Sequence, residues 1–222
     1  MATTQQEPLS PWQQWVQHPE RSRLRKGLFE IHLWIGAIVG MYVLVMSLSG
    51  SIIVFRNELS RWISVERIVQ LHERLLLSRE TGILVSGIGA TCLTTLCLTG
   101  AVIWWPGIRV WRRSFSVNWG AHFARITWDL HSALGFWCFL FVLMWGLSGM
   151  YFAFPRVFTG LPDRSLELLS ELHFGRFNRF TEAMWTVTGL VPGALAFTGV
   201  FICCRRVMFK KHSNPNTQAD PP

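Results

Sequence analysis

Charged side chains are scarce in this sequence. Only 15% of its 222 residues are Asp, Glu, Lys or Arg, whereas half are hydrophobic. The apolar residues gather into four long runs, at residues 31–55, 82–108, 130–154 and 183–204. A helix of about 20 such residues crosses a bilayer core of about 30 Å. The sequence therefore predicts an all-α membrane protein, built as a bundle of four transmembrane helices.

Several functional signatures are absent as well. There is no Gly-x-Gly-x-x-Gly loop or other nucleotide fingerprint, and no serine, cysteine or paired-carboxylate constellation that indicates hydrolysis. The five cysteines all lie in or at the apolar runs, which argues against a disulfide framework and against a zinc site. The missing Cys-x-x-Cys-His motif excludes covalent attachment of a c-type haem.

The polarity of the chain divides it into three parts. We predict a cytoplasmic leader at 1–27, a transmembrane domain at 28–209 and a polar tail at 210–222. The first apolar run is too long for the core of a signal peptide and follows a long polar leader, so we expect it to remain as a span.

Basic residues indicate the orientation of the spans. With four spans both termini lie on one side, which then carries twelve Lys and Arg residues, against nine Arg and no Lys in the two opposite loops. This bias favours cytoplasmic termini. The net charge of +8 is then mostly topological, and it predicts the lipid bilayer with its anionic headgroups as a partner, not nucleic acid.

The third run repeats the first at a constant offset of 99 residues, and the fourth repeats the second more loosely. In the first pair of runs the matches are Glu30-Ile31-His32 with Asp129-Leu130-His131, Gly36 with Gly135, and Leu48-Ser49-Gly50 with Leu147-Ser148-Gly149. In the second pair they are Leu71-His72 with Leu172-His173 and Thr99-Gly100 with Thr198-Gly199. This pattern predicts two parallel two-helix repeats, related by an axis along the membrane normal.

The duplication arranges four histidines in two pairs. His32 and His131 are expected at one depth near the cytoplasmic face, and His72 and His173 together near the opposite face. A lone histidine near a helix end is more often an interfacial or hydrogen-bonded residue than a ligand, but two symmetric pairs favour a functional site. His122 is either a spare ligand or an interfacial residue.

Glycines accompany the first pair of histidines. Gly36 follows His32 by four residues and Gly135 follows His131 by four, so each glycine lies on the same helix face as its histidine. Small residues on such a face commonly allow close helix packing. The alternative is a groove for a flat macrocycle held by the histidines.

Two imidazoles alone make a poor zinc site, but they are a complete axial set for haem iron. The sequence therefore predicts two b-type haems, one for each pair. His72 precedes the second run by ten residues, about 15 Å along a straight helix. We expect a bend around residues 78–82 that brings His72 toward the membrane.

These residues also carry a family resemblance. The chain resembles the PepSY-associated transmembrane family, which includes haem-containing siderophore reductases of the bacterial inner membrane. The resemblance covers roughly residues 25–206, and its motifs are Ile31-His32-Leu33-Trp34-Ile35-Gly36, Leu71-His72-Glu73-Arg74-Leu75, Trp104-Trp105-Pro106, Asp129-Leu130-His131 and Leu172-His173. It implies a four-helix core that binds two b haems and passes electrons across the bacterial inner membrane. Many members carry a large periplasmic domain between the first two spans, where this chain has only about 25 residues, 56–80.

The leading hypothesis is a dihaem oxidoreductase that reduces ferric siderophores or other ferric chelates at the periplasmic face. Its electron donor would be a quinol or a separate flavoprotein, and the chain could form a homo-oligomer. One alternative is a cytochrome b subunit that exchanges electrons with a partner enzyme, and another is a haem-free accessory protein of an iron-uptake system. A basic rim near the outer pair, made of Arg74, Arg79, Arg176 and Arg179, is expected to attract anionic ferric complexes.

Overall fold

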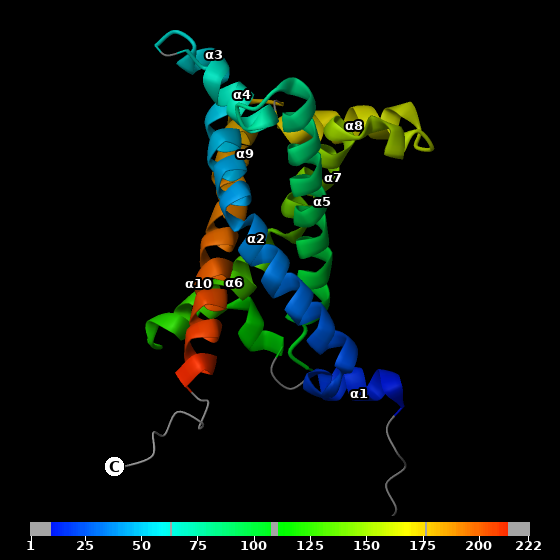
Figure 1. The fold of residues 1–222 in the computed structure, drawn as a ribbon, viewed down its shortest axis with the longest axis vertical. Helices are drawn as coiled ribbons and strands as arrows, with labels where there is room; N and C mark the ends of the chain where they lie inside the picture. Colours follow the sequence, from blue (N-terminus) through cyan, green and yellow to red (C-terminus); the bar gives the residue numbers. More distant parts are fainter. Residues whose placement is uncertain (1–9, 63, 108–110, 176, 213–222) are drawn as a thin grey trace, which may run out of the picture.

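The computed structural model describes residues 10–62, 64–107, 111–175 and 177–212. In these segments every regular element is helical, so the prediction of an all-α protein is confirmed. The helices form an elongated bundle with short helices at both ends (Figure 1).

Three parts of the bundle are long and apolar enough to cross a membrane. These are α2 (Arg23–Ile53), α5 (Arg79–Trp104) and the nearly continuous pair α9 (Arg179–Gly189) and α10 (Val191–His212). A fourth crossing is formed if the bent pair α6 (Phe123–Trp137) and α7 (Phe139–Ala153) counts as one span. The predicted runs thus correspond to helices, although the end of the second run, at residues 108–110, lies outside the described residues.

The remaining helices are short and lie at the two ends of the bundle. They are α1 (Pro11–Gln17), η1 (Pro19–Arg21), α3 (Arg56–Leu59), α4 (Glu66–Arg74), η2 (Trp111–Phe115), η3 (Pro155–Phe158) and α8 (Asp163–Phe174). Figure 1 shows α3, α4 and α8 at one end, and α1 with the end of α10 at the other. We refer to the end with α4 and α8 as the outer end and to the opposite one as the inner end, following the predicted orientation.

The spans pack in a ring. Helix α2 contacts both α5 and α10, α5 contacts α7, and α10 contacts α6. The inner end is reinforced by the leader, where Trp15 stacks on Trp105 at 6.4 Å and the Trp105 indole donates to the carbonyl of Val16. The residues called a polar leader therefore include a helix that docks against the end of α5.

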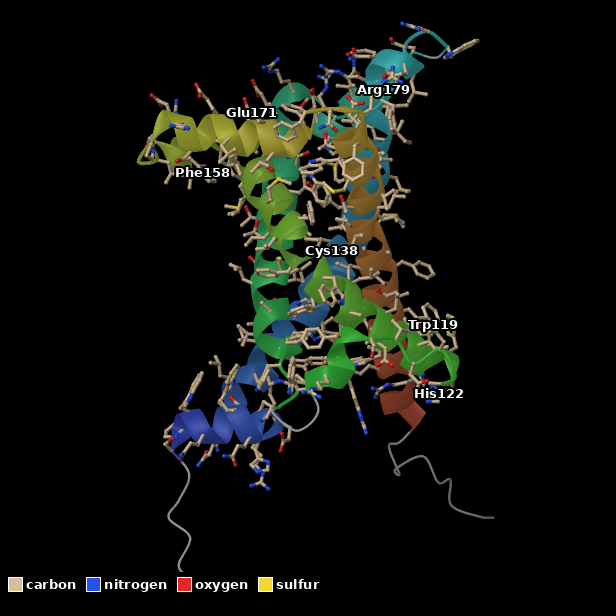
Figure 2. The ribbon with its side chains drawn as sticks, turned by 180° about the vertical axis from the view of Figure 1, so that it is seen from behind. Trp119, His122, Cys138, Phe158, Glu171 and Arg179 are labelled. Atoms are coloured by element: carbon tan, nitrogen blue, oxygen red, sulfur yellow. The ribbon has the colours of Figure 1, made fainter. Side chains whose placement is uncertain are left out.

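The third span is broken rather than continuous, in contrast to the single run at 130–154. The axes of α6 and α7 differ by 69° across Cys138, which lies at mid-height in the molecule (Figure 2). Aromatic contacts hold the end of α6 toward the inner end of α5, with Phe136 stacked on Trp104 at 4.4 Å. Beyond the break, the Cys97 thiol of α5 donates to the Phe139 carbonyl at the start of α7, which adds a contact between these two spans.

The expected bend near His72 is present, but it lies a few residues earlier than predicted. Helix α4 ends at Arg74 and is followed by Leu75 and Leu76, which both adopt left-handed backbone conformations. Helix α5 then begins at Arg79, with the Ser78 side chain as the cap of its first turn. The chain therefore reverses sharply and α4 packs back against α2 and α5. This reversal lowers His72 from a position beyond the span to one beside α2.

Close packing at Gly82 holds α4 against α5. A Cβ atom at this position would collide with the backbone carbonyl and the Cβ of Arg74, neither of which can move without moving α4. Gly82→Ala should therefore reduce stability by about 1–3 kcal/mol, the usual cost of overpacking. The measurement is the unfolding midpoint in detergent, and Gly27→Ala is the matched control because a Cβ at Gly27 meets nothing within 4 Å. Equal midpoints for the two variants would contradict this packing.

Candidate functional site

The inner histidine pair joins two spans. His32 on α2 and His131 on α6 have ring centroids 6.2 Å apart, with the ring planes nearly perpendicular at 86°. Each ring contacts a threonine of a further span through Nδ1: Thr99 Oγ1 of α5 lies 3.0 Å from His32 Nδ1, and Thr198 Oγ1 of α10 lies 2.8 Å from His131 Nδ1. The predicted neighbours therefore meet, and all four spans contribute to the site.

The outer pair has nearly the same spacing but comes from short helices. His72 on α4 and His173 on α8 have ring centroids 6.3 Å apart, with the planes inclined at 56°. Ser49 Oγ of α2 lies 3.2 Å from His72 Nδ1, and Ser148 Oγ of α7 lies 2.6 Å from His173 Nδ1. These contacts anchor the two short outer helices to the spans.

The outer histidines are partly buried, although their helices lie outside the spans. Burial lowers the pKa of His72, and burial together with the nearby His72 ring lowers the pKa of His173 to about 3. Both imidazoles are therefore neutral at physiological pH, and neutral imidazole is the form that binds a metal ion.

The serine and threonine contacts explain the repeated hydroxyl-glycine dipeptides. A Cβ on Gly100 would lie 3.2 Å from His32 Cε1, a Cβ on Gly199 would lie 3.2 Å from His131 Cε1, and a Cβ on Gly50 would lie 2.9 Å from His72 Cε1. In three of the four dipeptides the hydroxyl thus contacts the histidine while the glycine leaves room for its ring. In the fourth, a Cβ on Gly149 would instead approach Ala90 at 3.1 Å.

These hydroxyls are site residues that the sequence analysis missed. Ser49, Ser148, Thr99 and Thr198 were all noted as parts of repeated motifs, but their role toward the histidines was not. The available signal was the recurrence of a polar hydroxyl beside glycine inside an apolar run, in register with a histidine elsewhere in the same repeat. A hydroxyl in a span can also bond its own helix, so the pattern alone does not identify the partner.

The end of α8 is held by two tryptophans. Trp185 is buried on α9 and donates its indole N–H to the Leu172 carbonyl at 2.7 Å, while Trp145 of α7 donates to the His173 carbonyl at 3.4 Å. Gly175 ends the helix with a positive φ of 62°, and a Cβ there would collide with the Trp185 ring. These contacts fix the backbone that carries His173.

Acidic residues form ion pairs and a hydrogen bond on the helices that carry the inner pair. Asp129 is buried, forms an ion pair with Arg125 at 2.9 Å and accepts the backbone N–H of Asn118 at 3.3 Å. Its match in the first repeat, Glu30, pairs with Arg206 of α10. The acid two residues before each inner histidine therefore ties its helix to a neighbouring segment.

The remaining candidates lie apart from the pairs. His122 is the N-cap of α6, where its Nδ1 accepts the backbone N–H of Arg125, and it lies at the periphery of the inner end (Figure 2). This geometry supports the interfacial interpretation over a spare ligand. Of the expected outer arginines, Arg74 ends α4, Arg79 begins α5 and Arg179 begins α9, whereas Arg176 lies outside the described residues.

Gly36 and Gly135 do not lie in tight helix contacts. A Cβ on Gly36 would approach Leu96 at 3.7 Å and one on Gly135 would approach Leu195 at 3.9 Å, both ordinary van der Waals distances. By contrast, a Cβ on Gly40 would lie 2.6 Å from Val200, as expected for a true packing glycine. Close helix packing therefore does not account for Gly36 and Gly135.

Each pair offers two imidazole nitrogens as ligands. Among the described residues, no three His, Cys, Asp or Glu side chains are grouped so that they could hold a bare metal ion. Two trans metal–nitrogen bonds of about 2 Å each, extended by about 1.2 Å from each nitrogen to its ring centre, give a centroid separation of about 6.4 Å. The observed centroid separations of 6.2 and 6.3 Å are close to this value, so each pair has the spacing of two imidazoles that would share one metal ion.

Comparison with known families identifies the transmembrane region. The family model described as the PepSY-associated TM region matches residues 29–70 and 64–167, more than half of the chain. The chain therefore belongs to the PepSY-associated transmembrane family, as its motifs predicted. The match includes His32, His72 and His131 and ends before His173. No curated protein and no solved structure matches the chain.

The geometry around Gly50 makes a specific prediction for the outer pair. Gly50→Ala should displace the His72 ring, because the new Cβ would lie only 2.9 Å from Cε1. His72 should then react faster with diethylpyrocarbonate, which is measured by peptide mass spectrometry. Gly36→Ala on the same helix is the control, since its nearest neighbour is an ordinary contact with Leu96. Unchanged labelling of His72 in Gly50→Ala would show that the glycine is not needed to seat the ring.

Proposed function

We propose that this member of the PepSY-associated transmembrane family is a dihaem b protein that transfers electrons across the bacterial inner membrane. His32 and His131 would be the axial ligands of the inner haem, and His72 and His173 those of the outer haem. The observation that carries the proposal is the near-identical separation of the two pairs, 6.2 and 6.3 Å between ring centroids. Haem iron with two imidazole ligands supplies reversible one-electron chemistry.

The residues around the pairs fit this cofactor. Gly36 and Gly135 lie one helix turn from His32 and His131 and add no side chain to those faces, where Leu96 and Leu195 of the facing helices are the nearest neighbours, at ordinary van der Waals distances. A flat macrocycle needs such faces, because a side chain beneath it would collide with the ring. The absence of a third protein ligand among the described residues is also what a porphyrin requires, since it supplies four nitrogens itself.

The contacts of the inner pair support the proposed two-repeat arrangement. His32 contacts Thr99 and His131 contacts Thr198, and in both cases the partners are 67 residues apart in the sequence. The leucines opposite the two glycines, Leu96 and Leu195, also match at the 99-residue offset. Two repeats with the same internal contacts would produce this correspondence.

The two pairs lie toward opposite ends of the bundle, as transmembrane electron transfer requires. His32 and Ser49, which contacts the outer pair, are separated by 17 residues of the continuous helix α2. At 1.5 Å per residue this is about 25 Å along the helix axis, close to the thickness of the bilayer core. Cytoplasmic termini would then place the outer pair at the periplasmic face.

At the outer end, no large domain of this chain lies between the first two spans. The segment between α2 and α5 contains only the short helices α3 and α4, in place of the large periplasmic domain of many family members. Arg74, Arg79 and Arg179 lie at helix ends around this region. We propose that this basic rim draws anionic ferric siderophores or chelates toward the outer site, with a quinol or a flavoprotein as the electron donor.

A second candidate function is a cytochrome b subunit that passes electrons to or from a partner enzyme. The outer end favours it through its exposed apolar residues: Trp62 is 86% exposed and Phe180 is 76% exposed. Such side chains near a short outer loop are suited to a partner that supplies the missing outer domain. If the purified chain contains no haem, this result would favour the third hypothesis, a haem-free accessory protein of an iron-uptake system.

Substitution of the ligands tests the haem assignment. His32→Ala or His131→Ala should reduce the haem content from about two per chain to about one, because each haem needs both of its axial ligands. The measurement is a pyridine haemochrome assay with optical spectra. His122→Ala is the matched control and should retain both haems, since His122 caps α6 instead of facing a pair. Loss of haem only from the outer site in His32→Ala would contradict the proposed pairing.

The basic rim predicts that reduction of ferric complexes depends on charge and salt. Reversal of Arg74 and Arg79 to Glu should slow reoxidation of the prereduced protein by anionic ferric citrate. Added salt should reduce the difference, because the Debye length falls from about 10 Å at 0.1 M to about 3 Å at 1 M. Arg113→Glu at the inner end is the control, and stopped-flow spectroscopy measures the rates. Slow reoxidation by every ferric complex, insensitive to salt and to these substitutions, would favour the partner-dependent cytochrome subunit.

A further inference from the structure

We infer that four side-chain hydroxyls are positioning groups, which hold the paired histidines with the proton on Nδ1 and leave Nε2 free to bind a metal ion. The four belong to Ser49, Thr99, Ser148 and Thr198. The tautomer follows from the hydrogen bonds alone, whereas its use in metal binding rests on the proposed function.

The proton of each hydroxyl is already used by its own helix. Each oxygen donates to the carbonyl four residues earlier, as a back-bond within the helix. The bonds are Ser49 to Val45 at 2.7 Å, Thr99 to Thr95 at 2.7 Å, Ser148 to Met144 at 2.7 Å and Thr198 to Ala194 at 2.8 Å. A hydroxyl has a single proton and two acceptor lone pairs. Each oxygen therefore faces its histidine as an acceptor.

An accepting oxygen requires a donor on the ring. A neutral imidazole carries one N–H, so a proton on Nδ1 leaves a lone pair on Nε2. In the described part of the chain, the hydrogen bonds of these four rings to side-chain hydroxyls are all made at Nδ1. The hydrogen bonds thus select the same tautomer at all four positions. In this tautomer Nε2 has no proton and carries the lone pair that binds a metal ion.

His72 gives independent support. Its Nδ1 also lies 3.1 Å from the backbone carbonyl of Met46, a group that can only accept a hydrogen bond. Both neighbours of this nitrogen are therefore acceptors, and only a protonated Nδ1 satisfies them.

The four hydroxyls also connect each histidine ring to a second helix. The two threonines tie α2 to α5 and α6 to α10 at the inner pair, whereas the two serines tie α4 to α2 and α8 to α7 at the outer pair. An N–H that donates to an oxygen increases the basicity of the opposite nitrogen as a ligand, and loss of such a partner typically weakens metal binding by about 10–100-fold. The four hydroxyls should therefore influence both the affinity and the reduction potential of a bound haem.

The first experiment determines the tautomers of the paired histidines in the absence of any cofactor. The full-length chain, with 15N-labelled histidine and no haem, is studied in detergent by long-range 1H–15N correlation spectroscopy. His32 and His131 should show a protonated Nδ1 and an unprotonated Nε2. In Thr99→Val this preference should be lost for His32 and kept for His131. Thr94→Val is the matched control, because Thr94 is an equally buried threonine on α5 that bonds Ala90 and Met150 but no histidine.

The second experiment reads the effect on bound haem. Thr99→Val should weaken binding of added haemin at the inner site by about 10–100-fold and raise its reduction potential, because a less basic ligand stabilises ferric iron less. Thr99→Ser, which restores a hydroxyl, should recover both values. At the outer site, Ser148→Ala should have the same effects through His173, whose Nδ1 lies 2.6 Å from the Ser148 hydroxyl. Ser51→Ala is its control, because the buried Ser51 hydroxyl has no hydrogen-bond partner among the described residues.

The outcomes separate this inference from the proposed function. A proton on Nε2 of His32 in the unsubstituted chain would overturn the inference, as would identical tautomers, affinities and potentials in Thr99→Val and Thr94→Val. If instead the expected tautomers are observed but the chain binds no haemin, the positioning role of the hydroxyls stands and the dihaem proposal fails.

Discussion

The contact between an imidazole Nδ1 and a hydroxyl of a neighbouring helix is the interaction on which the rest of this structure depends. It occurs four times, and each time it joins two different helices. In an apolar environment an unpaired polar group costs several kcal/mol, so a buried histidine needs such a partner. Because the hydroxyl also bonds its own helix, ring and backbone form one connected network. These contacts thus connect each histidine to a second helix, beside the ring contact with its paired histidine.

This constraint also explains the irregular parts of the fold. His72 reaches Ser49 only because the chain reverses at Leu75 and Leu76, where two consecutive non-glycine residues adopt positive φ values. His173 reaches Ser148 from a helix whose end is fixed by Trp185. Strained or specially capped turns persist where the surrounding contacts over-determine them. Both outer helices follow this pattern, by different local means.

The sequence was sufficient to predict the helical class, the four apolar segments and the pairing of the histidines. Length and hydropathy determine the segments, and the repeated motifs, at offsets of 99 and 101 residues, indicated which histidines would meet. The break at Cys138 was not predicted, because it depends on aromatic packing between Phe136 and Trp104, which are distant in the sequence. The reversal before α5 was expected at residues 78–82 and lies earlier, since no glycine or proline marks Leu75 and Leu76. The roles of Ser49 and Thr99 were missed, because a hydroxyl within a span is equally compatible with a bond to its own helix.

The central proposal is that each histidine pair would supply both imidazole ligands of one haem. Its most direct test is low-temperature electron paramagnetic resonance of the oxidised, purified full-length protein, with haem and protein quantified in the same sample. The account predicts about two ferric haems per chain, both low-spin with the signature of two imidazole ligands. A protein without haem, or one whose haem is high-spin and therefore lacks a second strong axial ligand, would contradict it.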